Sequence, residues 1–239
     1  MLDIIDGLRP AQGWNITEAV TLGLGRLVYF GKETLPKSFA EWPEERRRSY
    51  TRAPLLQLAA FIDVVQKIEH SAAQTVVLLA QDPAFSSADV GFLAKFGIEV
   101  VQNPEAQRRI HSSTFTFCPF LRIEVERNIL ARCPPTQPQL HIAAAMSRHW
   151  YHGNEYLRGL PVHKLEECSE DVKEEVKVIQ QFTSVRLQRE WPEAVTWQDH
   201  MGGPLAIYGI DTQSSNDDQS EECKCTYCVQ NKTSPFKPV

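Results

Sequence analysis

The 239-residue sequence lacks several features that would settle its class at once. It has no apolar run long enough to span a bilayer, and Met1–Pro10 lacks the basic start and apolar core of a secretory signal. We therefore expect a cytoplasmic protein that does not contact membranes and keeps its six cysteines reduced. No G-x-S-x-G elbow is present, so no motif supports Ser49, Ser113, Ser147 or Cys118 as a nucleophile.

A complete glycine-rich dinucleotide motif is also missing. The expected first strand ends in Gly23, Leu24, Gly25 and Arg26, but the third glycine of the motif is absent and no helix follows directly. This excludes NAD binding through such a motif. The two glycines still predict a tight turn whose backbone a substrate can approach closely.

Positive charge is scarce, and it is unevenly placed. The net charge is −5, with 16 Lys and Arg against 15 Asp and Glu in the first 150 residues and 9 against 15 in the rest. Such a balance does not indicate general nucleic-acid binding, but a local basic cluster can still meet phosphates. The alternative is a solvated helix face paired with neighbouring glutamates. The cluster comprises Arg46, Arg47, Arg48 and Arg52.

Hydrophobic patterning predicts alternating strands and helices. The clearest helix is 53–70, with Pro54 in its first turn, and 75–80 reads as a strand buried on both faces. The polar stretch 29–51 is expected to be a surface excursion that ends with the arginine cluster. Strands are expected at 16–24, 75–80, 98–101, 113–118, 140–146 and 205–210, and helices at 53–70, 89–96, 104–110, 121–132 and 169–182.

This alternation predicts one Rossmann-like α/β domain, with a mostly parallel sheet flanked by helices. The domain is expected to cover residues 1–210, with a core of about 16–146 and additions over 150–210. Residues 211–239 form an acidic, cysteine-containing extension. We found no internal repeat.

Ligands of such sheets bind beyond the carboxyl ends of the strands. This rule nominates four rim segments, and within them Asp82 can either contact a ligand or bond backbone amides in a turn. Gln57 can reach the same rim or face solvent. The rim segments are 23–26, 81–83, 118–120 and 146–149.

The extension contains a D-D-x-x-E pattern formed by Asp217, Asp218 and Glu221. In a helix these carboxylates would share one face. Such a face binds a cation, which can be a metal, an ammonium group or a guanidinium such as that of an arginine substrate. The alternative is a solvated loop, because 212–222 is rich in small polar residues.

Three cysteines follow in a C-x-C-x2-C pattern. They can share one zinc ion if a fourth ligand comes from elsewhere, and the alternative is a surface thiol cluster. We predict no other cofactor. The cysteines are Cys223, Cys225 and Cys228, and the possible fourth ligands are Cys168, His163 and His200.

Several segments, taken in order, resemble the SRR1-like domain of regulators linked to light and clock signalling. The resemblance covers about residues 19–146. It departs at Arg26, where that family tends to have Ser or Asn, and at Pro119-Phe120, where it tends to have Pro-His. The segments are L-G-L-G-R at 22–26, Q-L-A at 57–59, Q-D-P-A-F at 81–85 and F-L-A-K-F-G-I-E-V-V at 92–101.

The D-D-x-x-E pattern, in a chain of this size, resembles the fungal arginine-containing cyclodipeptide synthases. This resemblance implies a transferase of secondary metabolism that uses arginyl-tRNA and a second aminoacyl-tRNA to make a cyclo-Arg-Xaa diketopiperazine. Asp217 and Asp218 would clamp the guanidinium while Glu221 accepts the amine proton, or the roles are exchanged. The arginine cluster would meet tRNA phosphates. The alternatives are a non-enzymatic SRR1-like binding protein with an acidic interaction tail and a zinc-stabilised module.

Overall fold

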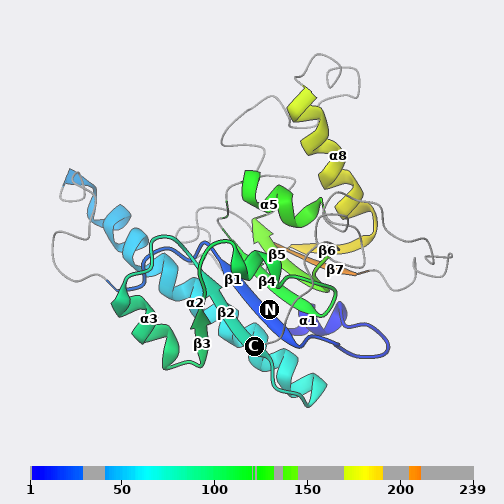
Figure 1. Ribbon diagram of the computed structural model, residues 1–239, viewed down its shortest axis with the longest axis horizontal. Helices are drawn as coiled ribbons and strands as arrows, with labels where there is room; N and C mark the ends of the chain where they lie inside the picture. Colours follow the sequence, from blue (N-terminus) through cyan, green and yellow to red (C-terminus); the bar gives the residue numbers. More distant parts are fainter. Residues whose placement is uncertain are drawn as a thin grey trace.

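The computed structural model describes residues 2–28, 41–119, 121, 123–131, 137–144, 170–190 and 205–210. They form a seven-stranded sheet in the order β3-β2-β1-β4-β5-β7-β6, with helices packed on both faces (Figure 1). The strands are β1 Glu18–Leu22, β2 Val77–Gln81, β3 Ile98–Val100, β4 Thr114–Cys118, β5 Leu140–Ala144, β6 Arg186–Glu190 and β7 Leu205–Ile210. The helices are α1 Leu2–Gly7, α2 Glu44–Ala72, α3 Ser87–Ala94, α4 Glu105–Arg108, α5 Ile123–Leu130 and α8 Glu170–Ser184.

The sheet is mostly parallel, which confirms the predicted Rossmann-like class. Strand β1 pairs in parallel with both β2 and β4, while β7 is antiparallel to its neighbours β5 and β6. The chain first builds outward from β1 through β2 to β3 and then crosses to β4. The strand order therefore reverses between β1 and β4, and that switch point is where a sheet of this kind binds ligands.

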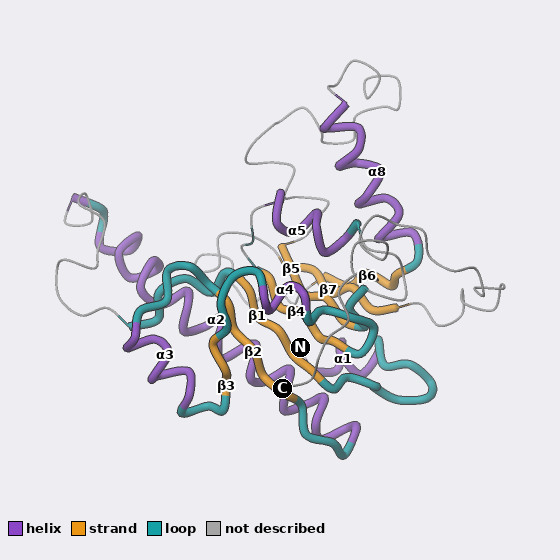
Figure 2. The backbone as a smooth tube through the Cα atoms, in the orientation of Figure 1, coloured by secondary structure: helices purple, strands orange, loops and turns teal. Residues whose placement is uncertain are grey.

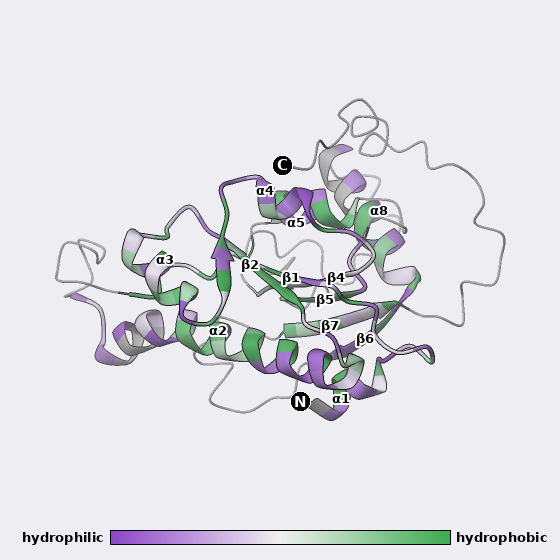
Figure 3. Cartoon of the chain, turned by 60° about the horizontal axis from the view of Figure 1, so that its bottom comes forward, coloured by the Kyte–Doolittle hydropathy of each residue, from purple (hydrophilic) through white to green (hydrophobic). Residues whose placement is uncertain are grey.

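Two helical layers enclose the sheet. Helices α1 and α2 lie on one face, and α4, α5 and α8 lie on the other (Figure 3). The α2 layer contributes Phe61, which stacks on Phe115 of β4 with ring centroids 5.8 Å apart. Every residue of β4 is buried, as expected for a central strand covered on both sides. No helix within the described ranges is long and apolar enough to cross a membrane.

Two sequence predictions are wrong. Helix α2 begins at Glu44 rather than at residue 53, so the arginine cluster is helical and the expected surface excursion does not extend over 44–51. Pro54 consequently lies inside the helix, where its missing N–H removes one helical hydrogen bond. Strand β6 was not predicted because its sequence, R-L-Q-R-E, is mostly polar. It forms a ladder with β7 and is the last strand in the sheet order, so it has one partner there.

Candidate functional site

The loop after β1 is tied to the end of β2 by the carboxylate of Asp82. The Gly25 N–H donates to Asp82 Oδ2 at 2.7 Å, and the Ala84 N–H donates to Asp82 Oδ1 at 2.7 Å. This contact confirms that the two predicted rim segments meet at one edge of the sheet. It also shows that Asp82 bonds backbone amides in a turn, which was one of the two alternatives for this residue.

Asp89 of α3 also holds this loop in place, through hydrogen bonds to its backbone. Its Oδ1 accepts hydrogen bonds from the N–H groups of Leu27 at 2.9 Å and Val28 at 2.7 Å. Its Oδ2 accepts from the N–H and the hydroxyl of Ser86, which completes a capping box at the start of α3. Burial opposes ionisation, but the hydrogen bonds from Ser86, Val28 and Leu27 outweigh it and lower the pKa of Asp89. The S-x-x-D pattern of a capping box was the sequence signal for this residue.

Asp82 and Asp89 limit which backbone amides of the loop can bind a ligand. Because protein carboxylates already accept from the amides of Gly25, Leu27 and Val28, those amides are not available to cradle a phosphate. Gly23 and Gly25 have φ of 76° and 73°, so glycine suits both positions. A ligand phosphate at this rim cannot use the amides of Gly25, Leu27 and Val28, and nearby cationic side chains can meet it instead.

Two polar groups in the α2 layer are buried without partners. Gln57 of α2 is 3% exposed, and its Oε1 has no hydrogen-bond partner among the described residues. Thr21 of β1 is fully buried, and its Oγ is likewise unpartnered. Thr21 shares a strand face with Ala19, which packs in the core cluster that includes the buried apolar residues of α2. Gln57 therefore does not face solvent, which was one of the two alternatives.

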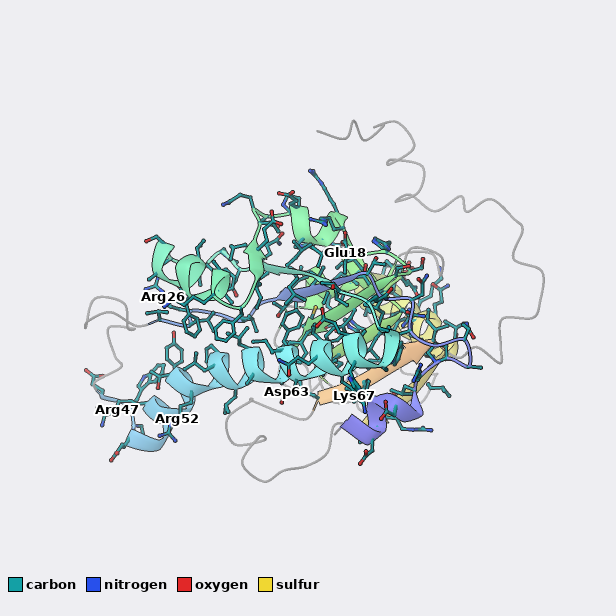
Figure 4. The ribbon with its side chains drawn as sticks, turned by 90° about the horizontal axis from the view of Figure 1, so that it is seen from below. Glu18, Arg26, Arg47, Arg52, Asp63 and Lys67 are labelled. Atoms are coloured by element: carbon teal, nitrogen blue, oxygen red, sulfur yellow. The ribbon has the colours of Figure 1, made fainter. Side chains whose placement is uncertain are left out.

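Three arginines gather at one end of the molecule, beyond the carboxyl end of β1. Figure 4 shows Arg26, from the loop after β1, together with Arg47 and Arg52 from the first turns of α2. Their guanidinium groups form no ion pair or hydrogen bond within the part of the chain that the structure describes. Of the predicted cluster, Arg46 and Arg48 also lie in α2, but their side chains are outside the described set.

A buried polar network under α5 was missed by the sequence reasoning. His141 of β5 lies between Thr116 and Glu126, with Nδ1 2.6 Å from the Thr116 hydroxyl and Nε2 3.2 Å from Glu126 Oε1. All three residues are fully buried, and Glu126 Oε2 has no hydrogen-bond partner in the part of the chain that the structure describes. In the sequence, His141 could have indicated this network, because it is a polar residue inside an apolar strand. The network joins β4, β5 and α5.

Cys118 lies at the end of β4 and is fully buried. Burial, reinforced by the nearby Glu126 carboxylate, raises the pKa of its thiol well above the usual value, so it is not a reactive thiolate. Ser113 directly precedes β4, at the opposite end of the strand from the rim. Neither residue gains support as a nucleophile, and the side chains of Ser49 and Ser147 are outside the described set.

Arg186, at the start of β6, is a further buried polar residue that the sequence did not indicate. Its NH2 donates to the Pro138 carbonyl at 2.7 Å, and its guanidinium carbon lies 4.2 Å from the centre of the Phe182 ring. Its Nε and NH1 are buried and form no hydrogen bond with the residues that the structure describes. Burial lowers the pKa of Arg186 to about 9, so the group is still charged at pH 7.

The remaining predicted residues lie outside the described residues. They are Asp217, Asp218 and Glu221 of the D-D-x-x-E pattern, Cys223, Cys225 and Cys228, the possible zinc ligands Cys168, His163 and His200, and the rim segment 146–149. Within the described ranges, no group of three or more His, Cys, Asp or Glu side chains is placed to hold a metal ion.

Comparison with known proteins places the chain in a family. The SRR1 domain model matches residues 4–231, and the chain therefore belongs to the SRR1 domain family. Among solved structures, the methyltransferase domain of a bacterial Hen1 protein is similar, with 13% identity, a TM-score of 0.35, and coverage of 87% of this chain and 97% of that one. No curated protein sequence matches this chain.

Proposed function

We propose that this SRR1-family protein is an aminoacyl-tRNA-dependent synthase of arginine-containing cyclodipeptides. The observation that carries the proposal is the set of unpaired arginines, Arg26, Arg47 and Arg52, at the end of the molecule where the β1 loop and Asp82 lie. Guanidinium groups without protein carboxylates as partners are suited to bind phosphates. The amides of Gly25, Leu27 and Val28 are bonded to carboxylates, and in this proposal the arginine side chains supply the phosphate contacts.

The chemistry needs no redox or energy-supplying cofactor. The free α-amine of one aminoacyl-tRNA attacks the ester carbonyl carbon of the other, so a C–N bond forms and the ester C–O bond breaks. The released tRNA hydroxyl takes the proton that the amine loses. The dipeptide amine then attacks its own ester, closes the six-membered ring and releases the second tRNA. The protein must hold the two esters together and accept a proton.

In this proposal Asp217, Asp218 and Glu221 form the acidic part of the site. Two of these carboxylates bind the arginyl guanidinium with parallel hydrogen bonds, and one accepts the amine proton. Gly23, Gly25 and Asp82 shape the rim that receives the ester end, and Gln57 supplies a hydrogen-bond acceptor. This arrangement requires the extension to lie against the rim.

The test is product formation by the purified full-length chain. Arginyl-tRNA is mixed with pools of other charged tRNAs, and arginine diketopiperazines are measured by mass spectrometry with and without ribonuclease. We expect a product that depends on intact tRNA. If no Arg-Xaa combination gives a product, the synthase proposal fails and a non-enzymatic binding role becomes the better account of the family membership.

A pair of neighbouring variants tests the acidic motif. Glu221→Gln is expected to abolish product, whereas Glu222→Gln removes the same charge one residue outside the motif and is expected to retain it. Asp217→Asn should behave like Glu221→Gln. Circular dichroism of each variant checks that folding is unchanged. Full activity in Glu221→Gln would remove that residue from the site.

A further inference from the structure

Helix α2 projects beyond the sheet at the candidate site. Gly25 lies just past the end of β1, and a Cβ placed on it would be 3.9 Å from Pro54 of α2. Because α2 has 29 residues, it is about 43 Å long, whereas the five residues of β1 extend about 17 Å. The turns before Pro54 therefore lie outside the sheet, beyond the strand ends (Figure 2).

The inner face of these turns continues the stripe that packs on the core. Arg47, Tyr50, Pro54, Gln57 and Phe61 recur every three or four residues, which places them on one side of the helix. Phe61 is fully buried against β4, and Tyr50 is 40% exposed at the projecting end. This side of α2 therefore packs in the core at Phe61 and is open to solvent at Tyr50.

The open part of this surface is aromatic and basic. The Tyr50 ring meets the Trp42 ring edge to face, with centroids 5.4 Å apart. Arg47 lies one turn away from Tyr50 on the same face, and Arg26 projects from the β1 loop at the same end of the molecule. Arg52 is on the opposite, outer face, because it is five residues from Arg47 along the helix.

Gln57 adds a buried acceptor at the inner end of the surface. Its unpartnered Oε1 carries the cost of a lost hydrogen bond in the unliganded protein. A ligand donor, such as a base amino group or a ribose hydroxyl, would satisfy it. A planar aromatic platform, cationic side chains and one polar contact together match a single-stranded nucleic acid, in which bases are free to stack.

We infer that the inner face of the α2 projection binds the single-stranded 3′ end of tRNA. Tyr50, supported by Trp42, stacks a base of the CCA end, Arg26 and Arg47 contact its phosphates, and Gln57 Oε1 accepts a hydrogen bond from the nucleotide. This inference rests on the proposed function, and it specifies which part of the tRNA the rim holds. It requires that duplex regions of tRNA contribute little to this contact.

The direct test is binding of a fluorescently labelled single-stranded RNA that ends in CCA, measured by anisotropy over a range of salt concentrations. Tyr50→Ala is expected to weaken binding about 5- to 150-fold, the effect of losing one stacked base, and Tyr50→Phe to keep most of it. Arg47→Ala should weaken binding and reduce the slope of log affinity against log salt by about 0.7. Lys95→Ala is the matched control and should bind like the wild type, because Lys95 is an exposed cation at the end of α3 that leads to the start of β3, away from the rim.

The outcomes separate this inference from the proposed function. It is overturned if the wild-type protein does not bind the RNA at low salt, if a blunt RNA duplex binds as tightly, or if Arg47→Ala and Tyr50→Ala weaken binding no more than Lys95→Ala does. Binding that follows the expected pattern without any diketopiperazine product would refute the synthase proposal alone. Full product formation by Tyr50→Ala and Arg47→Ala would refute this inference alone.

Discussion

Replacing Asp89 tests how the loop after β1 is held. The carboxylate accepts four hydrogen bonds, from the N–H groups of Leu27, Val28 and Ser86 and from the Ser86 hydroxyl. Asp89→Asn keeps one oxygen but turns an NH2 group toward donors, so at least one bond is lost and the remaining bonds no longer involve a charged acceptor. Hydrogen bonds to charged groups contribute about 1.5–3 kcal/mol each, and we expect a loss of about 3 kcal/mol in the free energy of unfolding.

Urea denaturation followed by circular dichroism measures this loss. With a denaturant dependence of about 3 kcal/mol/M, the midpoint of Asp89→Asn should fall by about 1 M at pH 7. Asp63→Asn is the control, because Asp63 is an exposed carboxylate on α2 (Figure 4), and its midpoint should not change.

The direction in which stability changes with pH provides a second test of the role of Asp89. The pKa of Asp89 is lowered in the folded protein, so its contribution is complete above the ordinary value of 3.8 and is lost as the pH falls through the lower folded value. The difference between wild type and Asp89→Asn should therefore narrow below about pH 4. Equal midpoints at pH 7, or a difference that grows in acid, would refute this account of the loop.

Three further results are expected. Gln57→Leu should leave the urea midpoint unchanged or higher, because the buried, unpartnered Oε1 is removed, and it should lower the RNA affinity. Thr21→Val should also leave the midpoint unchanged or higher. A large loss of stability in either variant would contradict the assignment of unpartnered atoms. Because burial lowers the pKa of Arg186 to about 9, the wild type should gain stability relative to Arg186→Met as the pH rises above about 9, and parallel pH profiles would contradict this. If the C-x-C-x2-C motif holds a structural zinc, the purified protein should retain about one equivalent after mild chelation, and less would favour a thiol cluster.

The rim of the site could be predicted from where the strands end in the sequence. Parallel strands that neighbour each other bring their carboxyl ends to one edge, so Gly25 and Asp82 could be placed together although 57 residues separate them. The same logic did not reveal Asp89, because its contacts with Leu27 and Val28 depend on how α3 packs against the loop. Nor could it show that Asp82 and Asp89 occupy the loop amides.

Helix α2 shows where local patterns mislead. The apolar spacing begins near Pro54, and proline is favoured in a first turn, so the helix was predicted to start at residue 53. The actual helix continues back to Glu44 through the arginines, with Pro54 packed near Gly25. Tertiary contact at this position outweighs the lost backbone hydrogen bond, and this decides where Arg47 and Tyr50 point.

The sequence by itself determined the α/β class, most strands and helices, and the meeting of Gly23–Arg26 with Asp82, because periodicity and turn residues act locally. Only the tertiary structure decided the antiparallel β7, the polar strand β6, the burial of Gln57 and the projection of α2 beyond the sheet. These features depend on which segments far apart in the chain pack together. A pattern read along the sequence does not contain that information.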